Sequence, residues 1–149
     1  MTIALNTNAL VRFLTQYDFE QFEIARNVIN NCIAKQPAFN CREVLLELVW
    51  VLERSYKFIR NEITAAVMGL VSVAELQVEA VEDVAEILPL YQNGGFRFLD
   101  LMIRQAAIRN GVHELQTFYR NSAQLAVVNP LQTSQLSTSH QAGLCVRIF

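Results

Sequence analysis

The chain has 149 residues, of which 52% are hydrophobic and 17% are charged. This length fits about one domain, and its apolar content excludes disorder over most of the chain and provides for a sizeable core. Twelve basic and fourteen acidic residues give a net charge of −2, which excludes a strongly basic nucleic-acid-binding tail.

Cysteine usage and the N-terminus indicate the compartment. Cys32, Cys41 and Cys145 form no CxxC pair and are odd in number, which favours reduced thiols and argues against a disulfide framework or a zinc site. No apolar run reaches the roughly 18 residues of a membrane span, and no basic region precedes the first apolar stretch as in a signal peptide. The sequence therefore predicts a soluble, cytoplasmic protein.

The first forty residues predict a strand, two helices and a second strand. Residues 2–5 are apolar and partly β-branched, and Thr7 or Asn8 is expected to cap the helix that follows. Apolar residues at helical spacing over 18–34 predict an amphipathic helix. Pro37 ends that pattern, and residues 38–40 are expected to form a short strand.

The middle of the chain is mainly helical. Residues 42–54 predict a helix that is apolar on nearly all sides, except for Glu47 in its centre. Asn61 is expected to cap the next helix. The alternation over 75–79 predicts a strand with one exposed face, and 81–93 predict a helix that Pro89 kinks or restarts.

The last elements complete an α/β pattern. Asp100 is expected to open a helix that Asn110 and Gly111 close, before strands at 115–118 and 126–128. Strands separated by helices predict an α/β layer with a mainly parallel sheet. The segment 129–149 is polar and without period, so the chain is divided into a domain over 1–128 and a poorly ordered C-terminal tail.

Candidate functional residues follow the predicted strands, because open parallel sheets bind ligands beyond the carboxyl ends of their strands. Asn6, Asp100 and Tyr119 stand at such places. Two of them also have a purely structural alternative. Asn6 suits a turn or cap, and Asp100 suits an ordinary helix cap. His113 and His140 have no neighbouring acid or cysteine at ligand spacing and are expected at the surface.

Glu47 is a candidate for another reason. A carboxylate inside an apolar helix costs several kcal/mol unless it is paired, binds a metal or faces a cleft. The structural alternatives are that Glu47 lies on an exposed stripe, or that it pairs with Arg54 or Arg104. The chain has no GxSxG, GxxxxGK[ST] or GxGxxG pattern, so acyl transfer and nucleoside triphosphate chemistry have no support.

Four segments stand out in order along the chain: IALNTNAL at 3–10, EVLLELVWVL at 43–52, GFRFLDLMI at 95–103 and QTFYR at 116–120. Together they resemble the PIN domain family, and most closely the VapC-type toxins of bacterial toxin–antitoxin pairs. The first is similar to the family's strand followed by Asp-Thr-Asn, the second to its Glu-bearing helix, the third to its third acidic motif, and the fourth to its Thr-Phe-Asp-Arg.

The resemblance implies a three-layer α/β/α domain with a short, mainly parallel sheet. It also implies an endoribonuclease whose ring of carboxylates holds Mg²⁺ or Mn²⁺, which activates water and neutralises the phosphate. RNA, an antitoxin protein and a second copy of the chain are the implied partners.

The chain departs from this ring of acids. Asn6 replaces the first acid, Tyr119 replaces the last, and Arg97 stands where relatives often have an acid. Glu47 and Asp100 remain, with Asn6 as a neutral third ligand, so metal binding and cleavage are expected to be weak or absent. This predicts a degenerate nuclease; the alternatives are a non-catalytic module that dimerises or holds an antitoxin, and an unselected remnant of a toxin gene.

Overall fold

The computed structural model describes residues 2–117, 125 and 128–130. No helix in this part of the chain is long and apolar enough to cross a membrane. The elements, in chain order, are α1 (Thr7–Thr15), α2 (Phe19–Asn30), β1 (Ala38–Asn40), α3 (Arg42–Arg54), α4 (Arg60–Ser72), β2 (Leu76–Val78), α5 (Val81–Gly94), α6 (Phe98–Arg109), β3 (Leu115–Thr117) and β4 (Val128–Pro130).

The strands are short and parallel, which confirms the predicted α/β class and is in keeping with a three-layer α/β/α arrangement. β1 pairs with β2 so that Ala38 lies opposite Leu76, and β3 pairs with β4. The strand predicted at 2–5 is reduced to a parallel bridge between Ala4 and Phe39. β4 runs two residues past the predicted domain boundary at 128, and the rest of the predicted tail lies outside the described residues.

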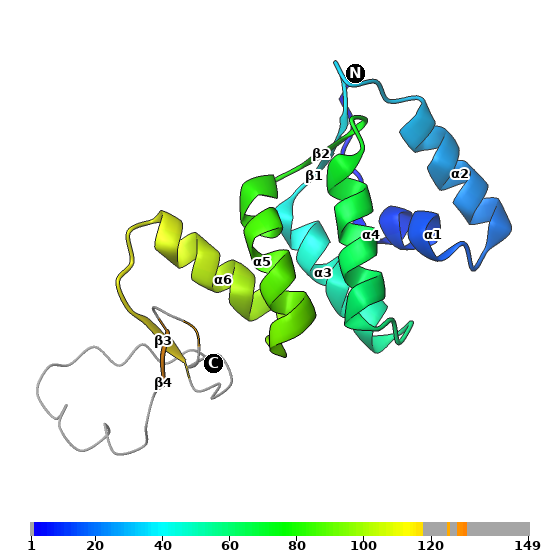
Figure 1. Ribbon diagram of the computed structural model, residues 1–149. Coiled ribbons are helices and arrows are strands. Elements are labelled where there is room, and N and C mark those ends of the chain that lie inside the picture. Colours follow the sequence, from blue (N-terminus) through cyan, green and yellow to red (C-terminus); the bar gives the residue numbers. More distant parts are fainter. Residues whose placement is uncertain (1, 118–124, 126–127, 131–149) are drawn as a thin grey trace, which may run out of the picture.

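The helices form two groups that meet at α3 (Figure 1). α1 contacts α2 and α3, whereas α5 contacts α4 and α6. α3 also contacts α4 and α6, so it lies between the N-terminal and C-terminal helix pairs. Any functional group on α3 is therefore within reach of both halves of the chain.

Two predicted helix caps are wrong. α1 is capped by Asn6, whose side-chain oxygen accepts the Ala9 N–H at 3.1 Å, rather than by Thr7 or Asn8. α4 begins at Arg60 with Ile59 as its cap residue, so Asn61 lies inside the helix. There the Glu62 carboxylate accepts the Ile59 N–H at 2.9 Å and satisfies a donor that a cap side chain would not reach.

Other helix limits also differ from the predictions. α2 ends at Asn30, before the predicted limit of 34 and well before Pro37. α5 continues through Pro89 as a single helix. Burial of Leu88 and Tyr91 on its inner face stabilises the helix on both sides of the proline, which offsets the lost backbone hydrogen bond.

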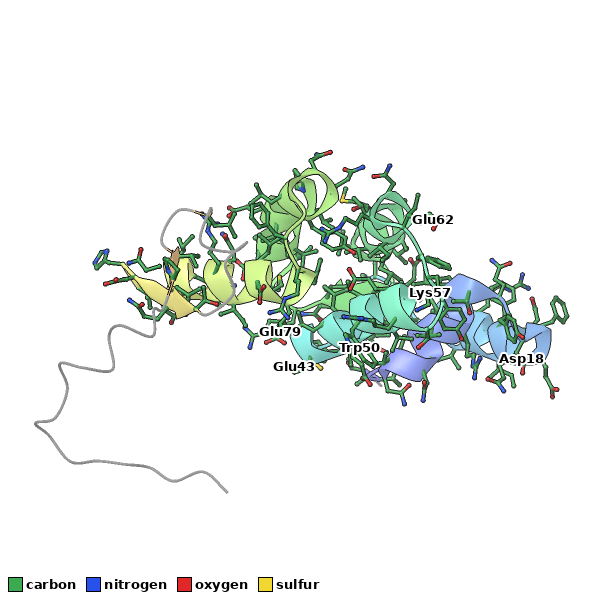
Figure 2. All side chains as sticks on the ribbon, turned by 90° about the horizontal axis from the view of Figure 1, so that it is seen from below. Asp18, Glu43, Trp50, Lys57, Glu62 and Glu79 are labelled. Carbon is green, nitrogen blue, oxygen red and sulfur yellow. The ribbon has the colours of Figure 1, made fainter. Side chains whose placement is uncertain are left out.

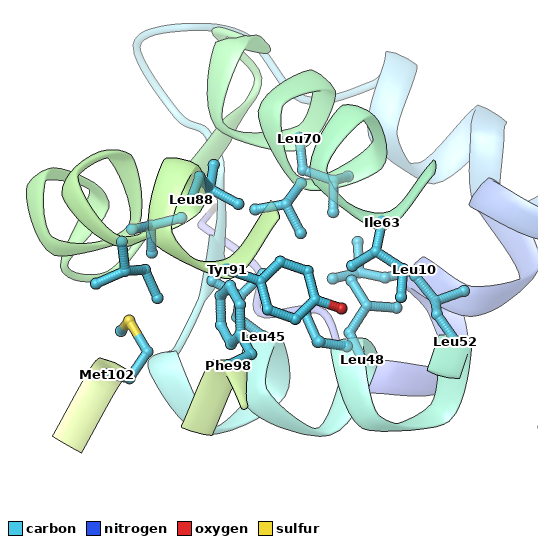
Figure 3. Close-up of a cluster of buried hydrophobic side chains, with 14 of the residues drawn as sticks. Leu10, Leu45, Leu48, Leu52, Ile63, Leu70, Leu88, Tyr91, Phe98 and Met102 are labelled. Atoms are coloured by element: carbon cyan, nitrogen blue, oxygen red, sulfur yellow. The ribbon is translucent and has the colours of Figure 1, made fainter. Parts of the chain in front are cut away.

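The hydrophobic core lies between α3, α4, α5 and α6 (Figure 3). Its fully buried side chains include Leu45, Leu48, Ile63, Leu88 and Tyr91. These residues recur at helical spacing on their helices, so one face of each helix is buried and the opposite face is exposed. The buried Asp83 pairs with Arg109 and joins α5 to α6.

A polar cluster anchors the core to the loop after α5. The buried Tyr91 hydroxyl donates to Glu53 at 2.7 Å, and burial together with this carboxylate raises the pKa of Tyr91. The guanidinium of Arg60 lies 4.6 Å from the Tyr91 ring centre and donates to the carbonyl oxygens of Tyr91 and Phe96, at 2.5 and 2.6 Å. Arg60 therefore fixes the loop that leads into α6.

Candidate functional site

The first two of the four segments that resemble the PIN domain family meet through one hydrogen bond. Thr7, buried at the start of α1, donates its hydroxyl to Glu47 Oε2 of α3 at 2.5 Å, across 40 residues of sequence. Asn6, which immediately precedes Thr7, is thereby held close to α3. The structure thus joins the residue directly after Asn6 to Glu47.

The Thr7–Glu47 contact predicts a measurable stability loss in Thr7→Val. This change keeps the shape but removes the donor to a carboxylate, so the free energy of unfolding is expected to fall by about 1–2 kcal/mol. Urea unfolding followed by circular dichroism measures it. Thr15→Val, which removes a bond only to the Val11 carbonyl of the same helix, is the matched control and should change stability by less than about 0.5 kcal/mol. Equal losses in the two variants would contradict the assigned contact.

Glu47 lies on the exposed side of α3, as one structural alternative predicted. Its carboxylate accepts a hydrogen bond from Thr7 of α1. The buried side of α3 carries Leu45, Leu48, Val49 and Leu52. Exposure to water lowers the cost of the charge, so Glu47 needs no metal to be stable in this position.

Asp100 lies in the first turn of α6 and is held by Arg97. The Arg97 Nε donates to Asp100 Oδ2 at 2.9 Å and its Nη2 to Oδ1 at 2.8 Å. Asp100 is not the cap residue, which is Arg97, so the simple cap alternative for Asp100 is wrong. The first turn of a helix nevertheless favours a negative charge, because its free N–H groups carry partial positive charge.

Two glycines place Arg97 at the start of α6. Gly95 ends α5 with a φ of +71°, a left-handed conformation that favours glycine. A Cβ on Gly94 would lie 2.5 Å from the Phe96 ring, so glycine lets this ring pack against the backbone. Burial of the Phe96 ring then fixes the backbone directly before Arg97.

A pocket of about 300 Å³ joins α3 to the start of α6. Its charged lining consists of Glu47, Glu53, Arg54 and Arg97. Trp50 also lines it and is 58% exposed, on the outward side of α3 (Figure 2). The pocket therefore combines two carboxylates, two guanidiniums and two aromatic rings, those of Trp50 and Phe98.

The described side chains do not form a metal-binding set as they stand. The Asn6 oxygen accepts from a backbone N–H, Glu47 accepts from Thr7, and both Asp100 oxygens accept from Arg97. No group of three or more His, Cys, Asp or Glu close enough to hold a metal occurs within 2–117, 125 and 128–130. Tyr119, the fourth predicted site residue, lies outside these ranges.

Of the other residues singled out by the sequence, those that the structure describes do not line this pocket. His113 is exposed after α6, as predicted, whereas His140 and Cys145 lie outside the described residues. Cys32 is buried and Cys41 partly buried, and both are free thiols.

Three residues around the site were not among the candidates predicted from the sequence. Trp50 and Glu53 follow Glu47 at intervals of three along α3, and such spacing places side chains on one helix face. That spacing is a signal that the sequence contained. Glu79, at the end of β2, accepts the Arg42 N–H at 2.9 Å and caps α3, which no local pattern indicated.

Comparison with known proteins accounts for this arrangement. The family model described as "PIN domain" matches residues 3–127. The chain is also 29% identical over 133 residues to a protein of Aquifex aeolicus (strain VF5) named VapC ribonuclease, an alignment that covers 87% of this chain and 98% of that relative. One α/β domain thus combines three features: the end of a first strand, a Glu-bearing helix and an Asp in the first turn of a later helix. Since the PIN domain model matches most of this domain, the chain belongs to the PIN domain family.

Proposed function

We propose that this protein is a VapC-like PIN domain descended from a metal-dependent endoribonuclease, with cleavage that is now weak or lost. The observation that supports the proposal is the Thr7–Glu47 hydrogen bond, which joins the residue directly after Asn6 to a carboxylate of the site. The position of the first acid is retained while its charge is absent. The relative named VapC ribonuclease supports the same origin.

The proposed roles follow from the charges that remain. Glu47 and Asp100 carry whatever affinity for Mg²⁺ or Mn²⁺ is left, and Asn6 offers a neutral oxygen. Tyr119 replaces the last acid of the ring. Two lost negative charges weaken binding of a hard divalent cation, which prefers carboxylate and water oxygens.

An RNA-cleavage assay with Mg²⁺ or Mn²⁺ tests this proposal. The double variant Asn6→Asp with Tyr119→Asp is expected to cleave at least about tenfold faster than the unmodified protein, because it restores two acids to the ring. Glu47→Gln in the reverted background is the control and should abolish the gain. A reverted protein that is folded yet inert would refute the inherited-nuclease origin of the site.

A second candidate function is a non-catalytic module that holds a partner protein, and a groove between α1 and α2 favours it. This groove has a volume of about 360 Å³ and is lined mainly by apolar side chains, among them Ala9, Ile24 and Val28. Ile24 is 58% exposed. An exposed apolar groove between helices suits the apolar face of a partner helix, such as that of an antitoxin.

Co-purification with a small partner separates this candidate from the first. The partner is expected to remain with the unmodified protein and to be lost from Ile24→Lys, because a charge in the groove opposes an apolar helix. Met68→Lys, at an exposed position of α4 outside the groove, is the matched control. Retention of the partner by Ile24→Lys would refute binding at the groove.

The remaining proposals concern the substrate, the assembly and the location of the protein. We propose RNA as the substrate if cleavage persists, a homodimer as the functional assembly and the cytoplasm as the location. Size-exclusion chromatography with light scattering measures the assembly directly.

A further inference from the structure

The Arg97–Asp100 pair is the contact in the site with the most defined geometry. Both oxygens of Asp100 accept from the same guanidinium, at 2.8 and 2.9 Å. Such two-point pairing fixes the plane of the guanidinium against the carboxylate and is stronger than a single charged hydrogen bond. The pair spans one helical turn, because Arg97 caps α6 and Asp100 lies three residues further on.

The burial of the two partners shows what the pair stabilises. The Asp100 side chain is 15% exposed, whereas that of Arg97 is 55% exposed. A carboxylate that is mostly withdrawn from water needs a counter-charge, and Arg97 supplies it from the solvent side. A divalent cation reaching Asp100 would need the same oxygens, and it would meet the positive charge of Arg97 at short range.

The charges that surround the pair also disfavour binding of a divalent cation. The pocket beside the pair has two carboxylates, Glu47 and Glu53, and two guanidiniums, Arg54 and Arg97. Glu53 is in addition bound to the Tyr91 hydroxyl. A pocket whose described charged side chains balance to zero does not attract a divalent cation as an excess of carboxylates does.

We propose that the guanidinium of Arg97 takes the place of a divalent metal in this site. It pairs with the Asp100 oxygens that the metal would otherwise bind. This inference rests on the proposed descent from a metal-dependent nuclease. It makes Arg97 a second cause of weak metal binding, separate from the loss of acids at Asn6 and Tyr119. Removal of Arg97 therefore raises metal affinity even when no acid is restored.

Calorimetric titration with Mn²⁺ tests this inference without any measurement of cleavage. Four proteins are compared: the unmodified chain, Arg97→Gln, Asn6→Asp with Tyr119→Asp, and the triple variant. Arg97→Gln is expected to tighten Mn²⁺ binding about tenfold or more in both backgrounds, because it removes a competing positive charge. Thermal melting confirms that each variant is folded.

Three further variants show that the effect belongs to the pair. Arg54→Gln removes another guanidinium of the same pocket and should tighten Mn²⁺ binding less than Arg97→Gln does. Arg97→Lys keeps the charge but loses the planar fork, and an intermediate affinity is expected. In the Asp100→Asn background, Arg97→Gln should no longer tighten binding.

The outcomes distinguish this inference from the proposed function. If the Mn²⁺ affinity is unchanged by Arg97→Gln in both backgrounds while the restored acids raise it, the role of Arg97 is refuted and the proposed function stands. If Arg97→Gln tightens Mn²⁺ binding but the restored acids give no RNA cleavage, the role of Arg97 stands and the proposed function is refuted. Absence of Mn²⁺ binding in all four proteins refutes the role of Arg97 as well, since removing it would then admit no metal.

Discussion

Leu48→Ala is expected to lower the free energy of unfolding by about 3–4 kcal/mol. Leu48 is fully buried in α3, the helix that contacts α1, α4 and α6, so the surrounding helices cannot collapse onto a smaller side chain (Figure 3). The loss combines the transfer of the removed carbons with the cavity that they leave. Chemical denaturation in urea, followed by circular dichroism, measures it.

Leu99→Ala is the matched control for this substitution. Leu99 lies on α6 beside the pocket but is 46% exposed, so its truncation should cost less than about 1 kcal/mol. A loss at Leu99 as large as at Leu48 would contradict the assignment of the core. Since Leu48 directly follows Glu47, the same experiment reports how firmly the core holds the Glu-bearing helix.

Arg60→Met is expected to lower the free energy of unfolding by about 2–3 kcal/mol. Methionine fills much of the volume of arginine, but it leaves the carbonyl oxygens of Tyr91 and Phe96 without their charged donor. It also removes the cation from the face of the Tyr91 ring. Thermal and urea unfolding measure the loss.

Arg42→Met serves as the control for Arg60→Met. Arg42 pairs with the exposed Glu43 at 3.5 Å, and such surface pairs contribute little, so a change below about 0.5 kcal/mol is expected. Arg60 has a further effect, because it holds the loop before Arg97. Amide hydrogen exchange in residues 95–101 should accelerate in Arg60→Met and stay unchanged in Arg42→Met; equal exchange in both would contradict this role of Arg60.

The elements that the sequence predicted well are those with strong local patterns. The helix at 42–54 and the strand at 38–40 have the predicted limits, because apolar spacing and Pro37 define them within a few residues. The caps of α1 and α4 were misplaced by one or two positions. At α4 the helix begins at Arg60, and Glu62 reaches back to the Ile59 N–H, so Asn61 lies within the first turn.

The sequence also predicted candidate site residues, through the resemblance of four segments to one family. It determined that Asn6 and Tyr119 carry no negative charge, and that Glu47 and Asp100 are carboxylates. These are facts of residue type, so no coordinates are needed to establish them. The family match over residues 3–127 agrees with the resemblance to that family.

Only the tertiary structure decided what each of these groups contacts. The Thr7–Glu47 bond joins residues 40 positions apart, so it exists only when α1 packs on α3. The Arg97–Asp100 pair is local in sequence, but it requires α6 to begin at Phe98, after the loop that Arg60 and Phe96 fix. Residue types thus follow from the chain itself, whereas the partners of its charges depend on packing, because a hydrogen bond forms only over about 3 Å.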